Sequence, residues 1–207
     1  HFRDARIVAL STGNVYPKVP VASGGAKETD PVGPEGEYAQ SCLGRERVFE
    51  YFSEAQGTPV CLVRLNYAVE ARYGVLLDVA TKVYAGEPVS VETGYVNVVW
   101  QGDANSVCFR ALEMCASPAA VLNLTGPEVL SVRALAEAFG ERFGRPPQIV
   151  GTEQPTALLS DATRCHERFG PPRVPVDAVV DLVAAWVRQG GATLGKPTKF
   201  EVRDGRF

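Results

Sequence analysis

The sequence has few of the residues that build metal sites. Its 207 residues include two histidines, and its five cysteines are scattered along the chain without a C-x-x-C pair. Protein zinc sites draw on closely spaced cysteine and histidine ligands, so this composition predicts no metal site. An odd number of separated cysteines is typical of a reducing compartment, and we expect a cytoplasmic protein. The cysteines are Cys42, Cys61, Cys108, Cys115 and Cys165.

Runs of like charge and long apolar runs are also lacking. The 21 basic and 24 acidic side chains are interspersed and give a formal net charge of -3. Nucleic-acid-binding surfaces need clustered lysine and arginine, so no nucleic-acid partner is expected. No apolar run approaches the roughly 18 residues that span a bilayer, and no signal segment opens the chain, so no membrane partner is expected either. The 45% hydrophobic and 22% charged residues are typical of a globular chain.

What the sequence does contain is an alternation of short apolar runs with amphipathic stretches. This alternation is typical of strand and helix units around a largely parallel sheet, and it predicts the α/β fold class. The helix expected at 35–56 repeats apolar residues at Leu43, Val48, Phe49 and Phe52, which predicts one buried stripe. Strands are expected at 6–11, 59–65, 95–101, 121–124 and 148–151, and helices at 35–56, 74–85, 103–116, 131–143 and 176–188.

Two polar positions are candidates for chemistry. Ser11 and Thr12 close the first expected strand, and the carboxyl ends of parallel strands form the rim where α/β sheets bind ligands. Serine and threonine at strand ends also form turns, which is the structural alternative for both. Tyr38 lies in the first turn of the next helix, where the positive end of the helix dipole favours a phenolate and hence acid/base catalysis. Amphipathic packing is the alternative for this tyrosine.

Two further polar residues are interpreted as helix caps. Ser131 and Asp103 stand at the beginning of expected helices, where a side-chain oxygen accepts from backbone N–H groups that have no partner inside the helix. Neither residue is therefore expected to take part in catalysis.

Taken in order, these segments resemble the extended short-chain dehydrogenase/reductase family of NAD-dependent epimerases and dehydratases. The segment S-T-G-N-V-Y at 11–16 resembles the family's S-[ST]-x-x-V-Y strand end, which implies that Thr12 carries the catalytic hydroxyl. Tyr38 falls where the catalytic tyrosine follows, and Gly44-x-Glu46 resembles the G-x-E that ends the same motif. Further segments that resemble the family are 63–66, 95–104, 121–126, 131–135 and 160–172, so the likeness extends over most of residues 6–190.

The resemblance implies a fold, a cofactor and a reaction. The fold would be a partial Rossmann-like parallel sheet with a smaller C-terminal α/β domain that binds substrate. The cofactor would be NAD or NADP, and the substrate a small molecule, namely a nucleotide sugar. Tyr38 would exchange a proton with a sugar hydroxyl during hydride transfer, while Thr12 hydrogen-bonds the same oxygen. The implied cofactor contacts are Ser11, Leu65 and Asn66, and the implied substrate contacts are Asn14, Tyr16, Tyr67 and Arg72.

The same resemblance divides the chain. Residues 1–66 would be the remainder of the dinucleotide-binding domain, with the catalytic strand and the tyrosine helix. Residues 67–190 would form mostly the substrate-binding domain, with some strands and helices returning to the Rossmann sheet. Residues 191–207 would be a C-terminal tail with a turn at Lys196-Pro197. Because the family commonly dimerises through the tyrosine helix, a homodimer is implied.

The sequence departs from the family at two places. The lysine that follows the family's tyrosine by four residues, and that holds the phenolate and the nicotinamide ribose, is Cys42 here. Arg45 and Lys27 are the candidates for supplying the missing charge through space. The G-x-x-G-x-x-G turn that holds the cofactor pyrophosphate has no counterpart, because Gly24-Gly25 lacks its spacing and its strand-to-helix setting. We therefore expect the C-terminal part of a longer protein, with weak or no NAD binding and no activity as it stands.

Two alternatives stay open at this point. One is a non-catalytic scaffold or binding protein that kept an NAD(P)-binding fold after losing the lysine, and Cys42 motivates it. The other is a dehydrogenase of the same broad family that acts on a sterol or flavonoid-like substrate.

Overall fold

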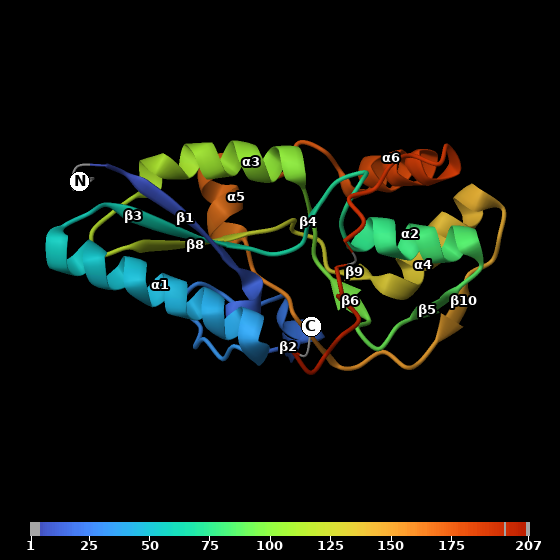
Figure 1. The fold of residues 1–207 in the computed structure, drawn as a ribbon, viewed down its shortest axis with the longest axis horizontal. Coiled ribbons are helices and arrows are strands. Elements are labelled where there is room, and N and C mark those ends of the chain that lie inside the picture. The colour runs from blue at the N-terminus through green and yellow to red at the C-terminus, as the bar shows by residue number, and fades with distance from the viewer. Residues whose placement is uncertain (1–4, 197, 206–207) are drawn as a thin grey trace.

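A computed structural model describes residues 5–196 and 198–205 of the protein. The first four residues of the expected 1–66 segment, Pro197 of the expected turn, and the last two residues of the 191–207 tail lie outside this description. The described chain forms two parts that lie side by side (Figure 1). One part is built around a parallel sheet and the other around a layer of helices.

A three-stranded parallel sheet organises the first part. Strands β1 (Ile7–Thr12), β3 (Val60–Leu65) and β8 (Ala120–Leu124) lie in the order β1-β3-β8. Thr12 pairs with Leu65, and Leu65 pairs with Leu124, so the carboxyl ends of the three strands are level. The central strand β3 is almost entirely buried, which explains its continuous apolar run. The predicted α/β class with a parallel sheet is confirmed.

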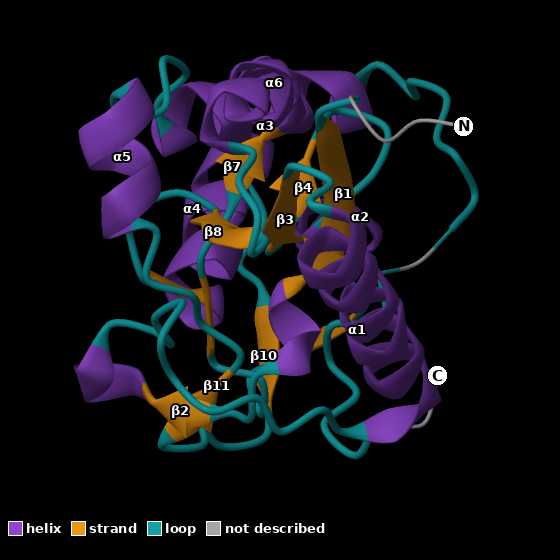
Figure 2. Ribbon diagram, turned by 90° about the vertical axis from the view of Figure 1, so that its left-hand side faces the viewer, coloured by secondary structure: helices purple, strands orange, loops and turns teal. Residues whose placement is uncertain are grey.

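Helices cover both faces of this sheet. Helix α1 (Gly36–Gln56) packs against β1, and α3 (Gln101–Arg110) lies on the opposite side (Figure 1). Helix α5 (Thr163–Phe169) packs on β8, and Figure 2 shows it beside the α3 layer. The apolar core on this side is formed by Cys61, Val63, Val107, Leu122, Cys165 and Phe169, among others.

The second part is a helical layer with a small parallel pair of strands. Helices α2 (Val75–Ala85), α4 (Val132–Phe143) and α6 (Val176–Arg188) pack against one another. Strand β5 (Pro88–Ser90) pairs in parallel with β10 (Gln148–Val150). The buried residues of this part form an apolar cluster of their own, in which Phe139 is fully buried.

Three pairs of two-residue strands complete the fold. They are β2 (Val19–Pro20) with β11 (Thr156–Ala157), β4 (Ala68–Val69) with β7 (Val99–Trp100), and β6 (Tyr95–Val96) with β9 (Leu130–Ser131). The prediction of a single strand at 95–101 was therefore wrong. Its first half pairs with β9 and its second half with β4, so the segment turns between two different partners. Short 3-10 helices occupy Gly13–Val15, Val21–Ser23 and Ala111–Met114.

The buried face of α1 differs from the predicted stripe. Val48 and Phe52 are 56% and 47% exposed, so they do not form an apolar stripe against the sheet. The prediction was wrong because the face that packs inward carries small side chains and one carboxylate, which allows the helix to lie close to β1. The buried residues of α1 are Ala39, Cys42, Glu46 and Ser53.

One of the two predicted helix caps is correct. Ser131 is the N-cap of α4, and its hydroxyl accepts from Ala134 N at 3.2 Å. Asp103 lies inside the first turn of α3, because that helix begins two residues earlier than expected. Its carboxylate accepts instead from the backbone N–H groups of Arg173 and Val174, both at 3.0 Å, and so ties α3 to the loop before α6.

Membrane spans and metal-binding clusters are both lacking in the described part of the chain. Within residues 5–196 and 198–205, no helix combines the length and the apolar character of a membrane span. The same residues contain no group of three or more His, Cys, Asp or Glu side chains arranged to hold a metal ion. All five cysteines are free thiols.

Candidate functional site

A cavity of about 480 Å³ lies at the carboxyl ends of β1 and β3. Its wall combines strand ends, the first turn of α1, the chain that enters α2, and the C-terminal tail. Most of the predicted site residues line it, namely Ser11, Thr12, Asn14, Tyr38, Leu65, Asn66 and Tyr67. The other lining residues are Ala68, Tyr73, Gly74, Val75, Thr198, Lys199, Phe200 and Val202.

Thr12 and Tyr38 meet at this cavity. Thr12 is the last residue of β1, Tyr38 lies in the first turn of α1, and both residues line the cavity. Thr12 Oγ1 also accepts from Asn14 N at 3.2 Å, which fixes the side chain as the cap of the following 3-10 turn. The Tyr38 side chain is not packed away, because the residue is 48% exposed.

The surroundings of Tyr38 act on its ionisation in opposite directions. Partial burial is the largest effect and raises the pKa of the phenol above its ordinary value of 10.0, and the Cys42 thiol raises the pKa further. The hydrogen bond with Thr12 and the positive charge of Arg45 lower the pKa. Because the net direction is upward, the phenol is protonated at neutral pH and is able to donate a proton.

Cys42 and Arg45 follow Tyr38 along α1. Cys42 is 3% exposed and packs in a buried apolar cluster with Val15, Tyr16 and Ala26. Arg45 Nη2 donates to Cys42 Sγ at 3.6 Å. Lys27, the other residue expected to supply charge, lies elsewhere: its charge lowers the pKa of Asp161.

The floor of the cavity is built by close approach of the strand ends. Gly13 follows Thr12, and a Cβ added there would lie 2.9 Å from Ser160 Oγ and 3.0 Å from the amide of Asn66. A larger residue would therefore force these neighbours apart. Asn66 Nδ2 donates to Asn97 Oδ1 at 2.8 Å, which holds the amide in one orientation.

Two residues of the rim have distinctive properties. The buried Ser11 Oγ has no hydrogen-bond partner among the described residues, although it lines the cavity. An unpaired buried hydroxyl is costly, so a polar ligand atom at this point would stabilise it. Tyr67 has a φ of 41°, which is rare for an aromatic residue, and burial raises the pKa of its phenol to about 12.

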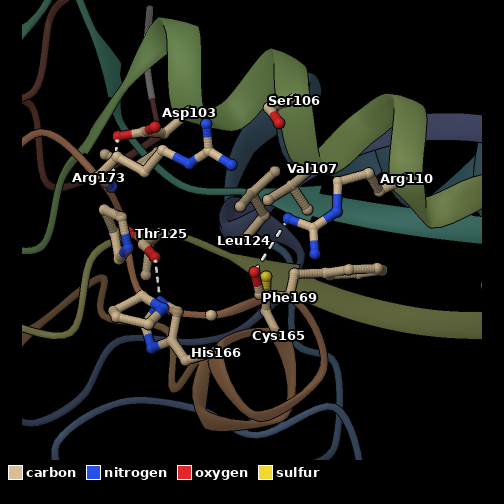
Figure 3. Close-up of a pocket in the computed structure, with 14 residues that line it drawn as sticks. Asp103, Ser106, Val107, Arg110, Leu124, Thr125, Cys165, His166, Phe169 and Arg173 are labelled. Atoms are coloured by element: carbon tan, nitrogen blue, oxygen red, sulfur yellow. Dashed lines mark hydrogen bonds between the residues drawn. The ribbon is translucent and has the colours of Figure 1, made fainter.

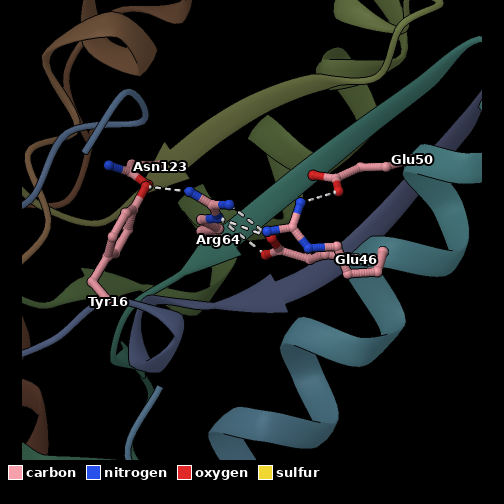
Figure 4. A network of polar contacts seen from close by, with 6 residues as sticks. Tyr16, Glu46, Glu50, Arg64 and Asn123 are labelled. Atoms are coloured by element: carbon pink, nitrogen blue, oxygen red, sulfur yellow. Dashed lines mark hydrogen bonds and ion pairs between the residues drawn. The ribbon is translucent and has the colours of Figure 1, made fainter. Parts of the chain in front are cut away.

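The prediction that Tyr16 contacts substrate was wrong. Tyr16 is 1% exposed and does not line the cavity. Its hydroxyl donates to Asn123 Oδ1 at 2.9 Å and accepts from Arg64 Nη1 at 2.7 Å (Figure 4). Arg64 in turn forms a buried ion pair with Glu46, at 2.7 Å between Nη2 and Oε2. The tyrosine is thus part of a buried polar network that joins α1, β3 and β8.

Arg72 lies outside this cavity, and its contact with substrate stays a prediction. Its side chain is 52% exposed and pairs with Glu70 at 3.0 Å, and it lines a separate cavity of about 490 Å³ beside the first one. Three tail residues line both cavities and so stand between them, namely Lys199, Phe200 and Val202.

The C-terminal tail is the part of the site that the sequence did not reveal. Asp78 in α2 accepts from Thr198 N at 2.9 Å, and Lys82 donates to Glu201 at 2.7 Å. These contacts join positions about 120 residues apart along the chain, and a polar tail carries no periodic pattern from which they could be predicted.

A third and much smaller cavity, of about 30 Å³, lies between α3 and α5 (Figure 3). A ring nitrogen of His166 lies 3.0 Å from Thr125 O, and Arg110 Nη1 donates to Phe169 O at 2.9 Å. The space would hold roughly one or two water molecules, and these polar groups around it are already paired. The contact of His166 ties α5 to the residue that follows β8.

Comparisons with known proteins give a result at the level of the fold. No family model matches the sequence, and no curated protein matches it. Solved structures do match the arrangement of its strands and helices, although few of their residues are identical to those of this chain. The chain shares the fold of these solved structures, so the α/β class with a Rossmann-like parallel sheet predicted from the sequence is confirmed.

Three solved structures illustrate the likeness. UDP-glucose 4-epimerase from Thermus thermophilus, complexed with NAD, is 21% identical with a TM-score of 0.75, over 90% of this chain and 66% of that chain. dTDP-glucose 4,6-dehydratase from Bacillus anthracis, complexed with NAD, is 15% identical with a TM-score of 0.77. The match covers 91% of this chain and 63% of the dehydratase chain. RMD from Pseudomonas aeruginosa, complexed with NADPH, is 20% identical with a TM-score of 0.74. The match covers 87% of this chain and 65% of the RMD chain. The chain thus spans just under two thirds of the length of these proteins.

Proposed function

We propose that the protein is an NAD(P)-dependent epimerase, dehydratase or reductase that acts on a nucleotide sugar, with Tyr38 as its acid/base group. The observation that carries this proposal is that Thr12 and Tyr38 line the same cavity on the carboxyl side of a parallel sheet. The carboxyl ends of parallel strands are where open α/β sheets bind ligands. The names of two similar structures, a UDP-glucose epimerase and a dTDP-glucose dehydratase, support the substrate class.

In this proposal Tyr38 moves a proton at the sugar hydroxyl. The Tyr38 phenolate takes the hydroxyl proton as the carbinol carbon becomes a carbonyl, and the phenol returns it in the reverse step. Thr12 lines the same cavity and would hydrogen-bond the same substrate oxygen. When bound, NAD(P) would accept and return the hydride.

The residues around the cavity fit the nicotinamide end of such a cofactor. Ser11 Oγ offers a buried hydrogen-bonding group without a partner among the described residues, and Leu65 offers an apolar surface beside it. Asn66 is held in place by Asn97, so its position is fixed before a ligand arrives. Asn14 and Tyr67 line the same space and are proposed to contact substrate.

The proposal also covers the organisation of the whole protein. We propose that 1–66 belongs to the dinucleotide-binding part, that 67–190 is mostly the substrate-binding part, and that 191–207 is a tail. A cytoplasmic location is supported by the five free thiols. A homodimer through α1 is supported by its exposed apolar side chains Val48, Tyr51 and Phe52, which are 56%, 65% and 47% exposed.

The experiment uses the protein with every residue that its gene encodes. It is incubated with UDP-, dTDP- and GDP-sugars in the presence of NAD or NADP, and the products are separated by chromatography while absorbance at the nicotinamide band is followed. We expect conversion of at least one nucleotide sugar that depends on the cofactor. Tight NADH binding, measured by fluorescence, without conversion of any nucleotide sugar would contradict the proposal.

A second candidate function is a non-catalytic binding or scaffold protein with the same fold. The observation in its favour is Cys42, which stands four residues after Tyr38 where the resemblance implies a lysine. The two functions are separated by comparing wild type with Cys42→Lys and Cys42→Ala. Turnover in wild type that survives in Cys42→Ala supports the enzyme, whereas turnover that appears only in Cys42→Lys supports the scaffold.

A further inference from the structure

The C-terminal tail contributes a cation to the cavity that Thr12 and Tyr38 line, which is called the first cavity here. Among the described residues that line it, Lys199 is the one whose side chain is charged at neutral pH. We propose that Lys199 binds the diphosphate of the substrate and so makes the site specific for nucleotide sugars over uncharged sugars. This inference rests on the proposed function, because it concerns the same substrate. Lys199 lies outside residues 6–190, so the resemblance to the family assigns it no role.

Lys199 is held in an unusual backbone conformation. Its φ is 55°, in the left-handed region that residues other than glycine rarely adopt. Contacts on both sides keep the tail in place, because Asp78 accepts from Thr198 N at 2.9 Å and Val202 N donates to Lys199 O at 3.0 Å. The next residue, Phe200, is 6% exposed and packs in the apolar cluster of the helical part. Strained residues persist where their surroundings hold them, and they cluster at ligand-binding sites.

The cavity of about 490 Å³ beside the first one, called the second cavity here, has predominantly positive walls. Both of its carboxylates are engaged by other groups, Asp78 by Thr198 and Glu201 by Lys82. A concave surface with an excess of positive charge attracts anions. Because Lys199 lines both cavities, an anionic group bound to it would lie at their boundary. The cations that line the second cavity are Arg72, Lys82, Lys196 and Lys199.

A nucleotide sugar fits this arrangement. Thr12 and Tyr38 line the first cavity at the strand end and the helix start, and Lys199 lines the same cavity from the tail. With its sugar beside Thr12 and Tyr38, the molecule would place its diphosphate at Lys199 and extend its nucleoside toward the second cavity. No carboxylate lines the first cavity among the described residues, so no negative charge there repels the diphosphate. Lysine binds phosphate as a point charge, in charge-assisted hydrogen bonds.

The experiment measures the binding of UDP, dTDP and GDP to the gene-encoded protein by calorimetry, with uridine, thymidine and guanosine as the uncharged counterparts. Wild type is compared with Lys199→Gln, Lys199→Gly, Lys199→Arg and Arg47→Gln. Lys199→Gly removes the side chain, and glycine adopts a φ of 55° readily, so the backbone of the tail is preserved. Arg47 is the control cation, because it is 62% exposed and lines neither cavity.

We expect the Kd of the nucleoside diphosphate to rise about 10–100-fold in Lys199→Gln and Lys199→Gly, because each loses a hydrogen bond between charged groups. The rise should be smaller in Lys199→Arg, which keeps the charge, and absent in Arg47→Gln. The Kd of the uncharged nucleoside should not change in any variant. A wild type that binds none of the three diphosphates overturns the inference, as does an unchanged Kd in the two neutral variants or an equal rise in Arg47→Gln.

NADH binding, followed by fluorescence, distinguishes the phosphates of the substrate from those of the cofactor. The affinity for NADH should be the same in wild type and in Lys199→Gln. A loss of NADH affinity with unchanged binding of the nucleoside diphosphates would assign Lys199 to the cofactor and overturn the inference.

Kinetics separate this inference from the proposed function. In an active enzyme, Lys199→Gln should raise KM for the nucleotide sugar and leave kcat little changed, because the lost contact is a binding contact away from the reacting carbon. An unchanged KM would refute the role of Lys199 alone. Diphosphate binding that depends on Lys199, in a protein that converts no nucleotide sugar, would leave Lys199 as a diphosphate-binding residue and refute the proposed function.

Discussion

Glu46 and Arg64 form a buried ion pair that joins the tyrosine helix α1 to the central strand β3. Arg64 Nε donates to Glu46 Oε1 at 3.0 Å and Arg64 Nη2 donates to Oε2 at 2.7 Å, so the pair is bidentate. The two side chains, arginine and glutamate, are 6% and 1% exposed. Tyr38 lies near the beginning of α1 and Thr12 at the end of β1, a strand of the sheet on which α1 packs. By tying α1 to this sheet, the ion pair helps to hold the two residues at the same cavity.

The first prediction concerns this ion pair. Glu46→Gln keeps the size of the side chain but leaves the Arg64 charge buried without its counter-charge, so we expect a loss of about 3–5 kcal/mol in the free energy of unfolding. Urea denaturation measures it. The control is Glu50→Gln, which removes the partly exposed pair with Arg47 and should cost no more than about 1 kcal/mol. Equal costs for the two variants would contradict the assignment.

The second prediction concerns stability at alkaline pH. Burial raises the pKa of Cys61 and of Cys165 from an ordinary 9.0 to about 12. A group whose pKa is raised in the folded state contributes stability that is complete below its unfolded pKa and is lost as the pH rises toward the folded pKa. The free energy of unfolding should therefore fall between pH 9 and about 12. In the double variant Cys61→Ala/Cys165→Ala, the free energy of unfolding should decline less steeply with pH. A slope identical to that of wild type would refute this account.

The third prediction concerns the tail that lines the cavity. Asp78→Ala removes the carboxylate that accepts from Thr198 N and Thr198 Oγ1. We expect faster amide hydrogen exchange over residues 198–202, measured by mass spectrometry, with little change in the rest of the chain. Asp181→Ala is the control, because it removes an aspartate that is 67% exposed and pairs with Arg142 away from the tail. Unchanged exchange in Asp78→Ala would show that the tail is held by other contacts.

The sheet could be predicted closely because its strands are local apolar runs. The strand expected at 59–65 is β3 (Val60–Leu65), and the one expected at 121–124 is β8 (Ala120–Leu124). Helix α5 was missed because its seven residues are too short to establish a period. The stripe on α1 was misplaced because apolar spacing does not reveal that Glu46 is neutralised by Arg64, which lies 18 residues away in sequence.

The candidate site could be predicted only where its residues follow a local motif. Thr12 and Tyr38 stand at a strand end and a helix start, and the topology brings these two positions together. Tyr16 belongs to the same sequence segment as Thr12, but its partner Asn123 is 107 residues away, and only the folded chain shows that its hydroxyl is buried. The contribution of Thr198 and Lys199 depends on long-range contacts of the same kind.

The most direct test of the central claim is the turnover of Tyr38→Phe. In the gene-encoded protein, with the nucleotide sugar that it converts, kcat should fall by about 10²–10⁴-fold, because the substitution removes only the acid/base oxygen. Tyr51→Phe, which alters an exposed tyrosine of the same helix, should stay close to wild type. NADH affinity should be unchanged in both variants. Wild-type turnover in Tyr38→Phe would contradict the account.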